Sequence, residues 1–339
     1  MQPVLGQRSY VSMRGAIILA NNIVADGHIN GLTARIVTHI HQDHIVDLRR
    51  SMREGLLIIG TPLTLDLLAA HGYSIPLNKR LEVSYNTPLR IEDFRVTLYR
   101  ANHVPGAAEV LVEHPDGTRI AYTGDFKLPG TDILKDIDVL VIDATYGMPS
   151  WRRPWQVEIE YLLADIVNEA LMTGPVRIFG YNGKIEEVML LLRRMGVSAP
   201  FILPHRKKKA ITVLERHGYR VGDYVLSSTS ECIEVRRSGW YIEFEHYNRW
   251  RRRHSLSRDG RPVNILLTGW EFRSPYRRVG PRDWIVSFSD HADFNQLLEY
   301  VEEARPSFLV VDAYRGGEAA HVFASYVAKT MGLRAVAQP

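Results

Sequence analysis

Three histidines and one aspartate lie within six positions of this chain, in the segment Thr38-His39-Ile40-His41-Gln42-Asp43-His44. The segment follows residues 35–38, a β-branched run that predicts the end of a strand. Because side chains alternate along a strand, the two histidines of the His-x-His pair point to the same side, and the Asp-His pair follows on the turn. Imidazole and carboxylate are ligands for zinc, and also for manganese or iron. The cluster therefore predicts a metal site rather than a histidine-rich surface turn.

Two further candidate ligands follow later strands. His103 comes after a predicted strand that ends at Arg100, and Asp125 ends the segment Tyr122-Thr123-Gly124-Asp125, again at a strand end. Taken alone, His103 suits an ordinary loop histidine and Asp125 a turn or cap residue. Their placement after the histidine cluster favours metal ligation.

The elements that must position these groups fall into three stretches. Residues 1–149 combine short strands, at 56–59, 95–100, 109–113, 119–123 and 139–142, with a helix that opens at Thr61-Pro62 and runs to 71. Between 150 and 280, strands at 176–180 and 201–203 alternate with helices at 157–173, 183–194 and 206–217, a pattern typical of a parallel sheet. Strands at 284–288 and 308–311 and helices at 294–304 and 318–331 follow. We expect an outer α/β domain made from both ends of the chain and an inserted α/β domain.

The ligand motifs resemble, in order and context, those of the metallo-β-lactamase fold. The matching residues are His39, His41, Asp43, His44, His103 and Asp125. The resemblance implies an αββα sandwich with one or two metal ions at the sheet edges. It implies one metal held by the first two histidines with His103 and Asp125, and a second held by Asp43 and His44 with Asp125 as a bridge. Zinc is the expected metal and manganese the alternative.

Two further motifs resemble those of the β-CASP nucleases within this fold. Asp143-Ala144-Thr145-Tyr146-Gly147 is similar to the acidic motif that opens the β-CASP insert, and residues 287–293 (Ser-Phe-Ser-Asp-His-Ala-Asp) are similar to the second motif. The resemblance implies a metallo-β-lactamase domain from residues 1–149 and 281–339, with a β-CASP insert over 150–280. It also implies that His291 is the general acid, that Asp143 favours its charged form, and that hydroxide supplied by the metal attacks the phosphodiester.

Within the β-CASP group, three segments are most similar to the ligase-associated DNA exonucleases, which include proteins named as messenger-RNA 3′-end processing-like factors. These segments are Tyr146-Gly147-Met148-Pro149, Gly183-Lys184 and residues 289–294. Two positions depart from the family pattern. RNA-cleaving members mostly carry a histidine after the strand at 308–311, where this chain has Asp312, which is either an oxygen ligand or a strand-end cap. The acidic motif begins with Asp143, where close relatives often use Glu, and the shorter side chain changes its reach to His291.

Basic residues gather in stretches that also hold aromatic residues. Arg206-Lys207-Lys208-Lys209 opens a predicted helix, Lys184 opens another, and Arg273 belongs to a group of arginines around Tyr276. Arginine interleaved with aromatic residues suits phosphate contact and base stacking, although an isolated run is typical of a solvated surface. The net charge of +4 permits an anionic partner. Beside a nuclease-like metal site, we expect Lys184, Arg206, Lys207 and Arg273 to contact nucleic acid.

The composition excludes several classes of protein. The 339 residues are 45% hydrophobic and 24% charged, which is ordinary for a globular chain of about two domains. The single cysteine, Cys232, excludes an intrachain disulfide and a cysteine-based zinc finger. No apolar stretch has the length of a membrane span, and the N-terminus lacks the pattern of a secretion signal. We therefore expect a cytoplasmic protein with no membrane partner.

The leading hypothesis is a metal-dependent phosphodiesterase, a nuclease that acts on DNA as an exonuclease in repair, with a DNA ligase or another repair protein as a partner. The missing third-motif histidine favours DNA, and an RNA-processing β-CASP ribonuclease is the nearest alternative. Small-molecule hydrolases of the same fold lack the inserted domain. A non-catalytic nucleic-acid-binding scaffold would have lost ligand positions that are intact in this chain.

Overall fold

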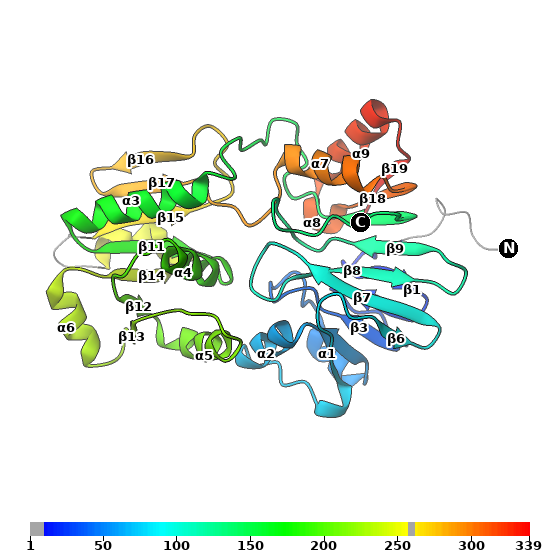
Figure 1. The fold of residues 1–339 in the computed structure, drawn as a ribbon, viewed down its shortest axis with the longest axis horizontal. Helices are drawn as coiled ribbons and strands as arrows, with labels where there is room; N and C mark the ends of the chain where they lie inside the picture. The colour runs from blue at the N-terminus through cyan, green and yellow to red at the C-terminus, as the bar shows by residue number, and fades with distance from the viewer. Residues whose placement is uncertain (1–9, 257–261) are drawn as a thin grey trace. The chain divides into compact units, whose positions relative to one another are not determined.

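The computed structural model describes residues 10–256 and 262–339, and the chain divides into two compact units (Figure 1). The first unit contains the chain up to Arg152 together with Asp290–Pro339, and the second is Arg153–Ser289. The boundaries that we expected from the sequence lie near residues 150 and 280. Residues 1–9, where a secretion signal was sought, lie outside the described residues, as do 257–261.

The first unit is built on two β-sheets. The five-stranded sheet has the order β1-β2-β3-β4-β5 and the seven-stranded sheet the order β19-β18-β10-β9-β8-β7-β6. The strands of the first sheet are β1 (Ile17–Ala20), β2 (Ile23–Ala25), β3 (Ala34–Ile36), β4 (Leu57–Gly60) and β5 (Arg80–Glu82). Those of the second are β6 (Leu89–Ile91), β7 (Phe94–Arg100), β8 (Ala108–Glu113), β9 (Arg119–Tyr122), β10 (Val139–Ile142), β18 (Phe308–Asp312) and β19 (Ala335–Gln338). Because β10 pairs in parallel with both β9 and β18, the two ends of the chain share one sheet.

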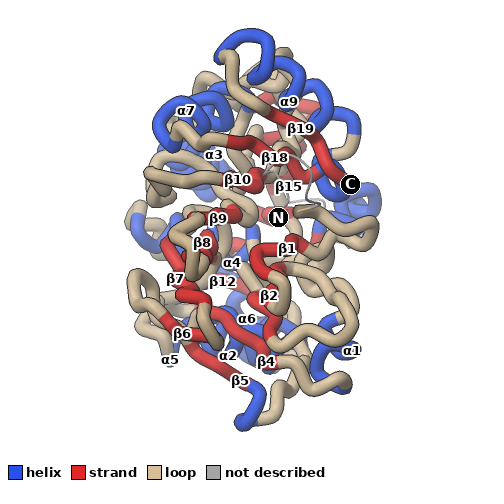
Figure 2. The backbone as a smooth tube through the Cα atoms, turned by 90° about the vertical axis from the view of Figure 1, so that its right-hand side faces the viewer, coloured by secondary structure: helices blue, strands red, loops and turns tan. Residues whose placement is uncertain are grey.

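Three layers of apolar side chains make this unit an αββα sandwich. Aliphatic residues from both sheets, such as Ile36 and Val110, form one buried cluster between them. A second cluster on the five-stranded sheet includes residues of α1 (Leu48–Arg53) and α2 (Pro62–Ala70). A third lies on the seven-stranded sheet under α7 (Phe294–Ala304) and α9 (Glu318–Met331). Figure 2 shows α1 beside β4 and α9 beside β19, so the fold class expected from the sequence is confirmed.

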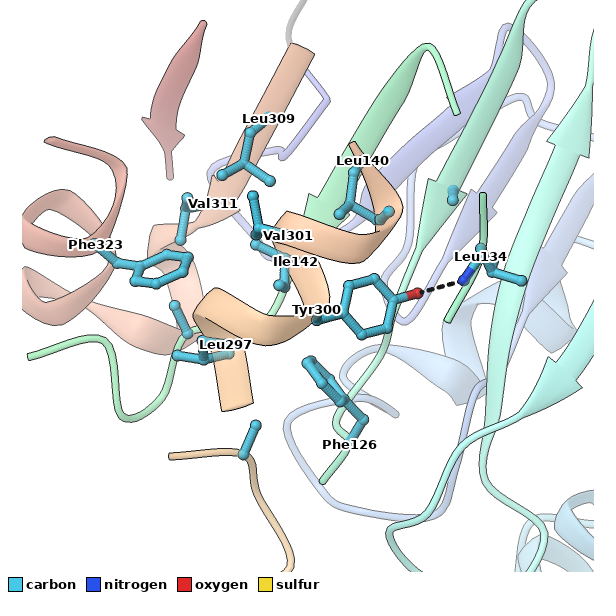
Figure 3. Packing of buried hydrophobic residues seen from close by; sticks show 14 of the residues in the cluster. Phe126, Leu134, Leu140, Ile142, Leu297, Tyr300, Val301, Leu309, Val311 and Phe323 are labelled. Carbon is cyan, nitrogen blue, oxygen red and sulfur yellow. Dashed lines mark hydrogen bonds between the residues drawn. The ribbon is translucent and has the colours of Figure 1, made fainter. Parts of the chain in front are cut away.

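The three helices predicted for the sandwich, α2, α7 and α9, lie at or close to their predicted ranges. Thr61 accepts a hydrogen bond from the backbone N–H of Thr64 at 3.1 Å, and Pro62 occupies the first turn, where its missing N–H costs nothing. The bounds of α7 and α9 equal the predicted ranges. Figure 3 shows Val301 of α7 close to the strand residues Leu140 and Leu309, while Tyr300 of the same helix points toward Leu134 and lies beside Phe126.

The second unit is built on one seven-stranded sheet with the order β13-β12-β14-β11-β15-β17-β16. All its neighbouring strands are parallel except β16 and β17, which confirms the predicted α/β pattern. The strands are β11 (Val176–Gly180), β12 (Phe201–Leu203), β13 (Tyr224–Leu226), β14 (Ile242–His246), β15 (Val263–Leu267), β16 (Tyr276–Gly280) and β17 (Asp283–Val286). The helices are α3 (Ile159–Thr173), α4 (Lys184–Arg194), α5 (Lys208–Arg216) and α6 (Glu231–Ser238), with a 3-10 segment η4 (Tyr247–Ser255) after β14.

The helix predicted from residue 206 starts with a 3-10 turn, η3 (His205–Lys207), before α5 begins. Within the described part of the chain, none of the helices combines the length and the apolar character that crossing a bilayer requires.

Candidate metal centre

Loops that follow β3, β7 and β9 bring four of the predicted ligands together in the first unit. His39 and His41 lie after β3, His103 after β7 and Asp125 after β9. One possible ligand atom from each residue lies within 4.8 Å of those of the other three. His39 Nε2 is 3.3 Å and His103 Nε2 is 3.5 Å from Asp125 Oδ2, and His41 Nδ1 is 3.0 Å from His103 Nε2. These residues are far apart in the sequence, and they converge because the strands that precede them end close to one another.

The donor atoms of this cluster fit a divalent metal ion. The Nε2 atoms of His39 and His44 are buried, and neither makes a hydrogen bond with a described residue. A buried polar atom without a hydrogen bond costs about 1–3 kcal/mol, and coordination of a metal would satisfy both atoms. Three imidazoles and a carboxylate form a donor set for zinc or manganese.

Asp125 faces two groups of partners through its two oxygens. Oδ2 faces His39 and His103, whereas Oδ1 lies 3.1 Å from Nε2 of His44. The same Nε2 is 3.5 Å from Oδ2 of Asp43, whose side chain is 58% exposed. This arrangement suits a carboxylate shared between two neighbouring metal-binding positions. Buried histidines line one of them, and the other is open toward Asp43.

The other ring nitrogens of two histidines, the Nδ1 atoms, have polar partners that orient the imidazoles. Nδ1 of His44 is 2.8 Å from Oδ2 of Asp26, which also accepts a hydrogen bond from the Thr38 hydroxyl at 2.6 Å. Nδ1 of His103 is 2.7 Å from the backbone carbonyl oxygen of Asp290. Such contacts fix which ring nitrogen faces the metal. Neither Asp26 nor Asp290 was predicted to contact these imidazoles. A signal existed for Asp26, because it directly follows β2, as other candidate ligands follow their strands.

Burial and neighbouring charge set the protonation of the cluster. Burial lowers the pKa of His39 to about 4, and it also lowers the pKa of His41 and the pKa of His103. Burial raises the pKa of Asp125, but the charges of His44 and other imidazoles outweigh it and bring that pKa well below its ordinary value. Neutral imidazoles and an ionised carboxylate are the forms that bind metal.

His291 lies beside the cluster and contacts two carboxylates. Its Nδ1 is 3.2 Å from Oδ2 of Asp143, and its Nε2 is 3.8 Å from Oδ2 of Asp125. Asp143 is itself fixed, because its Oδ1 accepts hydrogen bonds from the backbone N–H and the hydroxyl of Thr145 at 3.0 and 2.8 Å. Burial lowers the pKa of His291, but the charges of Asp125 and Asp143 more than offset burial and raise it to about 9. The imidazole is therefore protonated at neutral pH.

Asp312 does not join the groups that could hold a metal among the described residues. Its Oδ1 accepts from the backbone N–H groups of Tyr314 and Arg315, and its Oδ2 accepts from Arg315 Nη1 at 2.6 Å. Asp312 thus caps the short helix α8 (Ala313–Gly316), which is one of the two roles that the sequence left open.

The four basic residues predicted to contact nucleic acid, all in the second unit, differ in their surroundings. Lys184 is buried and donates to the Phe288 carbonyl at 3.2 Å. Lys207 is buried and donates to Glu186 and Asn182 at 2.7 and 2.8 Å. Arg206 and Arg273 are exposed. Only the two arginines therefore present their charged groups to solvent.

Comparison with known proteins identifies the class. The family described as "Beta-lactamase superfamily domain" matches residues 14–180. An uncharacterized protein in a "lig 3'region" of Acidianus ambivalens is 46% identical over 138 residues, which are 40% of this chain and 98% of that protein. A solved protein of unknown function from Enterococcus faecalis has the same fold, with a TM-score of 0.55, 15% identity, and coverage of 84% of this chain and 77% of that one.

Two longer relatives have names that state a function. The human DNA cross-link repair 1A protein is 31% identical over 313 residues, and a probable RNase of Methanocaldococcus jannaschii is 24% identical over 299 residues. The matches cover 84% and 73% of this chain, but only 28% and 66% of those proteins. Residues 14–180 belong to the beta-lactamase superfamily, and the names of these two relatives support a place within the β-CASP nuclease family.

Proposed function

We propose that this protein is a DNA exonuclease of DNA repair, with zinc as its native metal and manganese as the alternative. The observation that carries the proposal is the contact of His291 with both Asp143 and Asp125, at the edge of the histidine cluster. The departing sugar oxygen of a phosphodiester requires a proton, and a protonated imidazole in this place can supply it.

In this proposal the chain holds one metal through His39, His41, His103 and Asp125, and a second through Asp43, His44 and Asp125. When bound, such ions lower the pKa of water to near neutrality and stabilise charge on the attacking and leaving oxygens. His291 holds its proton at Nε2, on the side of Asp125, and Asp143 fixes the ring through Nδ1. The protonated imidazole then acts as general acid toward the leaving oxygen.

Two observations support DNA as the polymer. Asp312 is engaged as a helix cap, at the position where RNA-cleaving members mostly carry a histidine. The human relative is named for DNA cross-link repair. RNA is the second candidate, because another relative is named as a probable RNase. The name of the Acidianus relative supports a DNA ligase as a partner, and we propose a cytoplasmic location.

The test is a paired cleavage assay. The wild-type chain, with added zinc or manganese, is given end-labelled single-stranded DNA and RNA of the same sequence. The double variant His41→Ala, Asp43→Ala removes two proposed ligands, and His321→Ala, an exposed histidine of α9, is the matched control. We expect stepwise DNA shortening that the double variant loses and the control keeps.

Each other result of this assay has a defined meaning. Cleavage of RNA alone would replace DNA by RNA as the substrate. Internal cuts instead of stepwise shortening would make the enzyme an endonuclease. No cleavage of either polymer, with bound metal shown by elemental analysis, would reject the nuclease assignment for the chain alone.

A further inference from the structure

We propose that the second unit carries a nucleobase-stacking site, formed by Tyr181 and Tyr247, with Arg206 as its phosphate contact. The ligand is a single-stranded stretch of nucleic acid. This inference rests on the proposed nuclease function and deepens it, because it names a place outside the metal centre that holds the substrate strand.

The topology of the sheet makes the carboxyl ends of β11 and β14 a switch point. Strands β11 and β14 are parallel neighbours, with Gly180 paired to His246 at their carboxyl ends. After β11 the chain passes through α4 to β12, which lies beyond β14 in the sheet. After β14 it passes through η4 to β15, which lies beyond β11, so the two connections run in opposite directions along the sheet. Since crossover connections are right-handed, the two connections cover opposite faces, and ligands of open parallel sheets bind at such switch points.

The two tyrosines lie at this switch point. Tyr181 is the first residue after β11, and Tyr247 is the first residue after β14. Their rings are stacked, with centroids 4.7 Å apart and planes 17° apart, and His246 meets the Tyr181 ring edge-on at 5.7 Å. Tyr181 remains 49% exposed. A rigid ring pair at the surface offers a flat face on which any base can stack, because every base has a π-face.

An exposed cation lies on the turn after the neighbouring strand β12. Arg206 and Lys207 belong to the turn after β12, the neighbour of β14. Lys207 is engaged by Glu186 and Asn182, whereas Arg206 is exposed and makes no ion pair or hydrogen bond with any residue that the structure describes. Because β12 pairs with β14, this turn and the end of β14, where Tyr247 follows, belong to neighbouring strands of one sheet.

The chemistry of these groups identifies the ligand. A guanidinium with an open fork matches the geometry of a phosphate, and stacked aromatic rings match a base. The N-terminus of α4 is closed to anions, since the Glu186 carboxylate accepts the Gly183 N–H at 2.9 Å. We assign phosphate contact to Arg206, because its turn follows β12, the strand that pairs with β14, and the site reads a strand without sequence preference.

The experiment measures binding separately from cleavage. Fluorescein-labelled oligo(dT) is titrated with the full chain in chelator, so that strand cleavage does not contribute, and anisotropy is recorded. We expect Tyr181→Ala to weaken binding about 5- to 30-fold. Tyr181→Phe, which keeps the ring, should bind within about twofold of wild type. Arg206→Ala should weaken binding. It should also reduce the slope of log affinity against log salt concentration by the amount that corresponds to about one phosphate contact.

Matched controls come from the same unit, where Tyr219 and Arg220 are also exposed. Tyr219→Ala and Arg220→Ala should bind as wild type, and thermal melting verifies that each variant is folded. Wild-type affinity in folded Tyr181→Ala and Arg206→Ala would overturn the site, as would absence of oligo(dT) binding by the wild-type chain. The nuclease assignment is judged by the metal-dependent assay, so failure of one proposal is distinct from failure of the other.

Discussion

Arg315 donates a hydrogen bond from Nη2 to the backbone carbonyl of Asp43 at 3.0 Å, and so ties the segment after β18 to the loop that carries the histidine cluster. The same nitrogen reaches the carbonyls of Gly15 and Asp26 at 3.0 Å, while Nη1 donates to Asp312. The Arg315 side chain is only 3% exposed. One buried guanidinium therefore fixes the loop that carries the proposed ligand Asp43. It also fixes Asp26, which orients the proposed ligand His44.

We expect Arg315→Lys to loosen this loop. An ammonium group keeps the charge but cannot reproduce the fork of hydrogen bonds, so buried carbonyls lose their donors. The free energy of unfolding should fall by about 1–3 kcal/mol, measured by urea denaturation. Zinc affinity, measured by chelator competition, should fall as well. Arg305→Lys, at an exposed arginine, is the control, and unchanged stability and zinc affinity in Arg315→Lys would refute the positioning role.

Asp26 should control metal affinity without being a ligand. Its carboxylate holds Nδ1 of His44, and loss of such a contact typically reduces metal affinity 10- to 100-fold. We expect about that reduction for Asp26→Asn, read as zinc retained against a chelator series. Asp47→Asn, at a partly exposed aspartate of the loop that carries His44, should retain zinc like wild type. Equal retention by both variants would show that Asp26 does not orient His44.

The pH dependence of cleavage should report the Asp143–His291 pair. Burial lowers the pKa of His291, but Asp125 and Asp143 raise it to about 9, so the wild-type rate should fall as pH rises through about 9 and the general acid loses its proton. Asp143→Asn removes one of these charges and lowers the pKa of His291. The alkaline limb of kcat should then move about one pH unit or more toward acid.

The control for this pH profile is Thr145→Val, which removes a hydrogen bond to Asp143 but keeps the carboxylate. Its alkaline limb should stay close to that of wild type. An alkaline limb at the same pH in wild type and Asp143→Asn would mean that another group donates the proton.

Local sequence signals predicted part of the fold, because capping, strand alternation and strand-end motifs depend on neighbours in the chain. The bounds of α7 and β10 could be predicted for that reason, whereas β1, β2, β5 and α1 were not predicted. The motif resemblance predicted the distant pair Asp143 and His291, but other partners distant in sequence could not be predicted. Lys207 looked like a phosphate contact, but Glu186, 21 positions earlier, pairs with its charge in the fold. Asp290 supports His103 across 187 positions through a backbone carbonyl, which no side-chain motif encodes.

Glu109 of β8 should make folding stability depend on pH in a direction unusual for a carboxylic acid. It is buried and accepts a hydrogen bond from the Tyr300 hydroxyl at 2.6 Å, while its Oε2 has no partner among the described residues. Burial raises its pKa well above the ordinary value of 4.5. The folded chain then keeps a proton that the unfolded chain releases above pH 4.5, so stability falls as pH rises.

Glu109→Gln removes this titration and should flatten the loss of stability between about pH 5 and 8. The slope attributable to Glu109 is at most about 1.4 kcal/mol per pH unit, since one proton is involved. Urea denaturation at several pH values measures the difference between variant and wild type. Glu113→Gln, at a partly exposed glutamate of the same strand, should leave the wild-type slope in place. Parallel stability curves for wild type and Glu109→Gln would show that Glu109 is ionised in the folded protein.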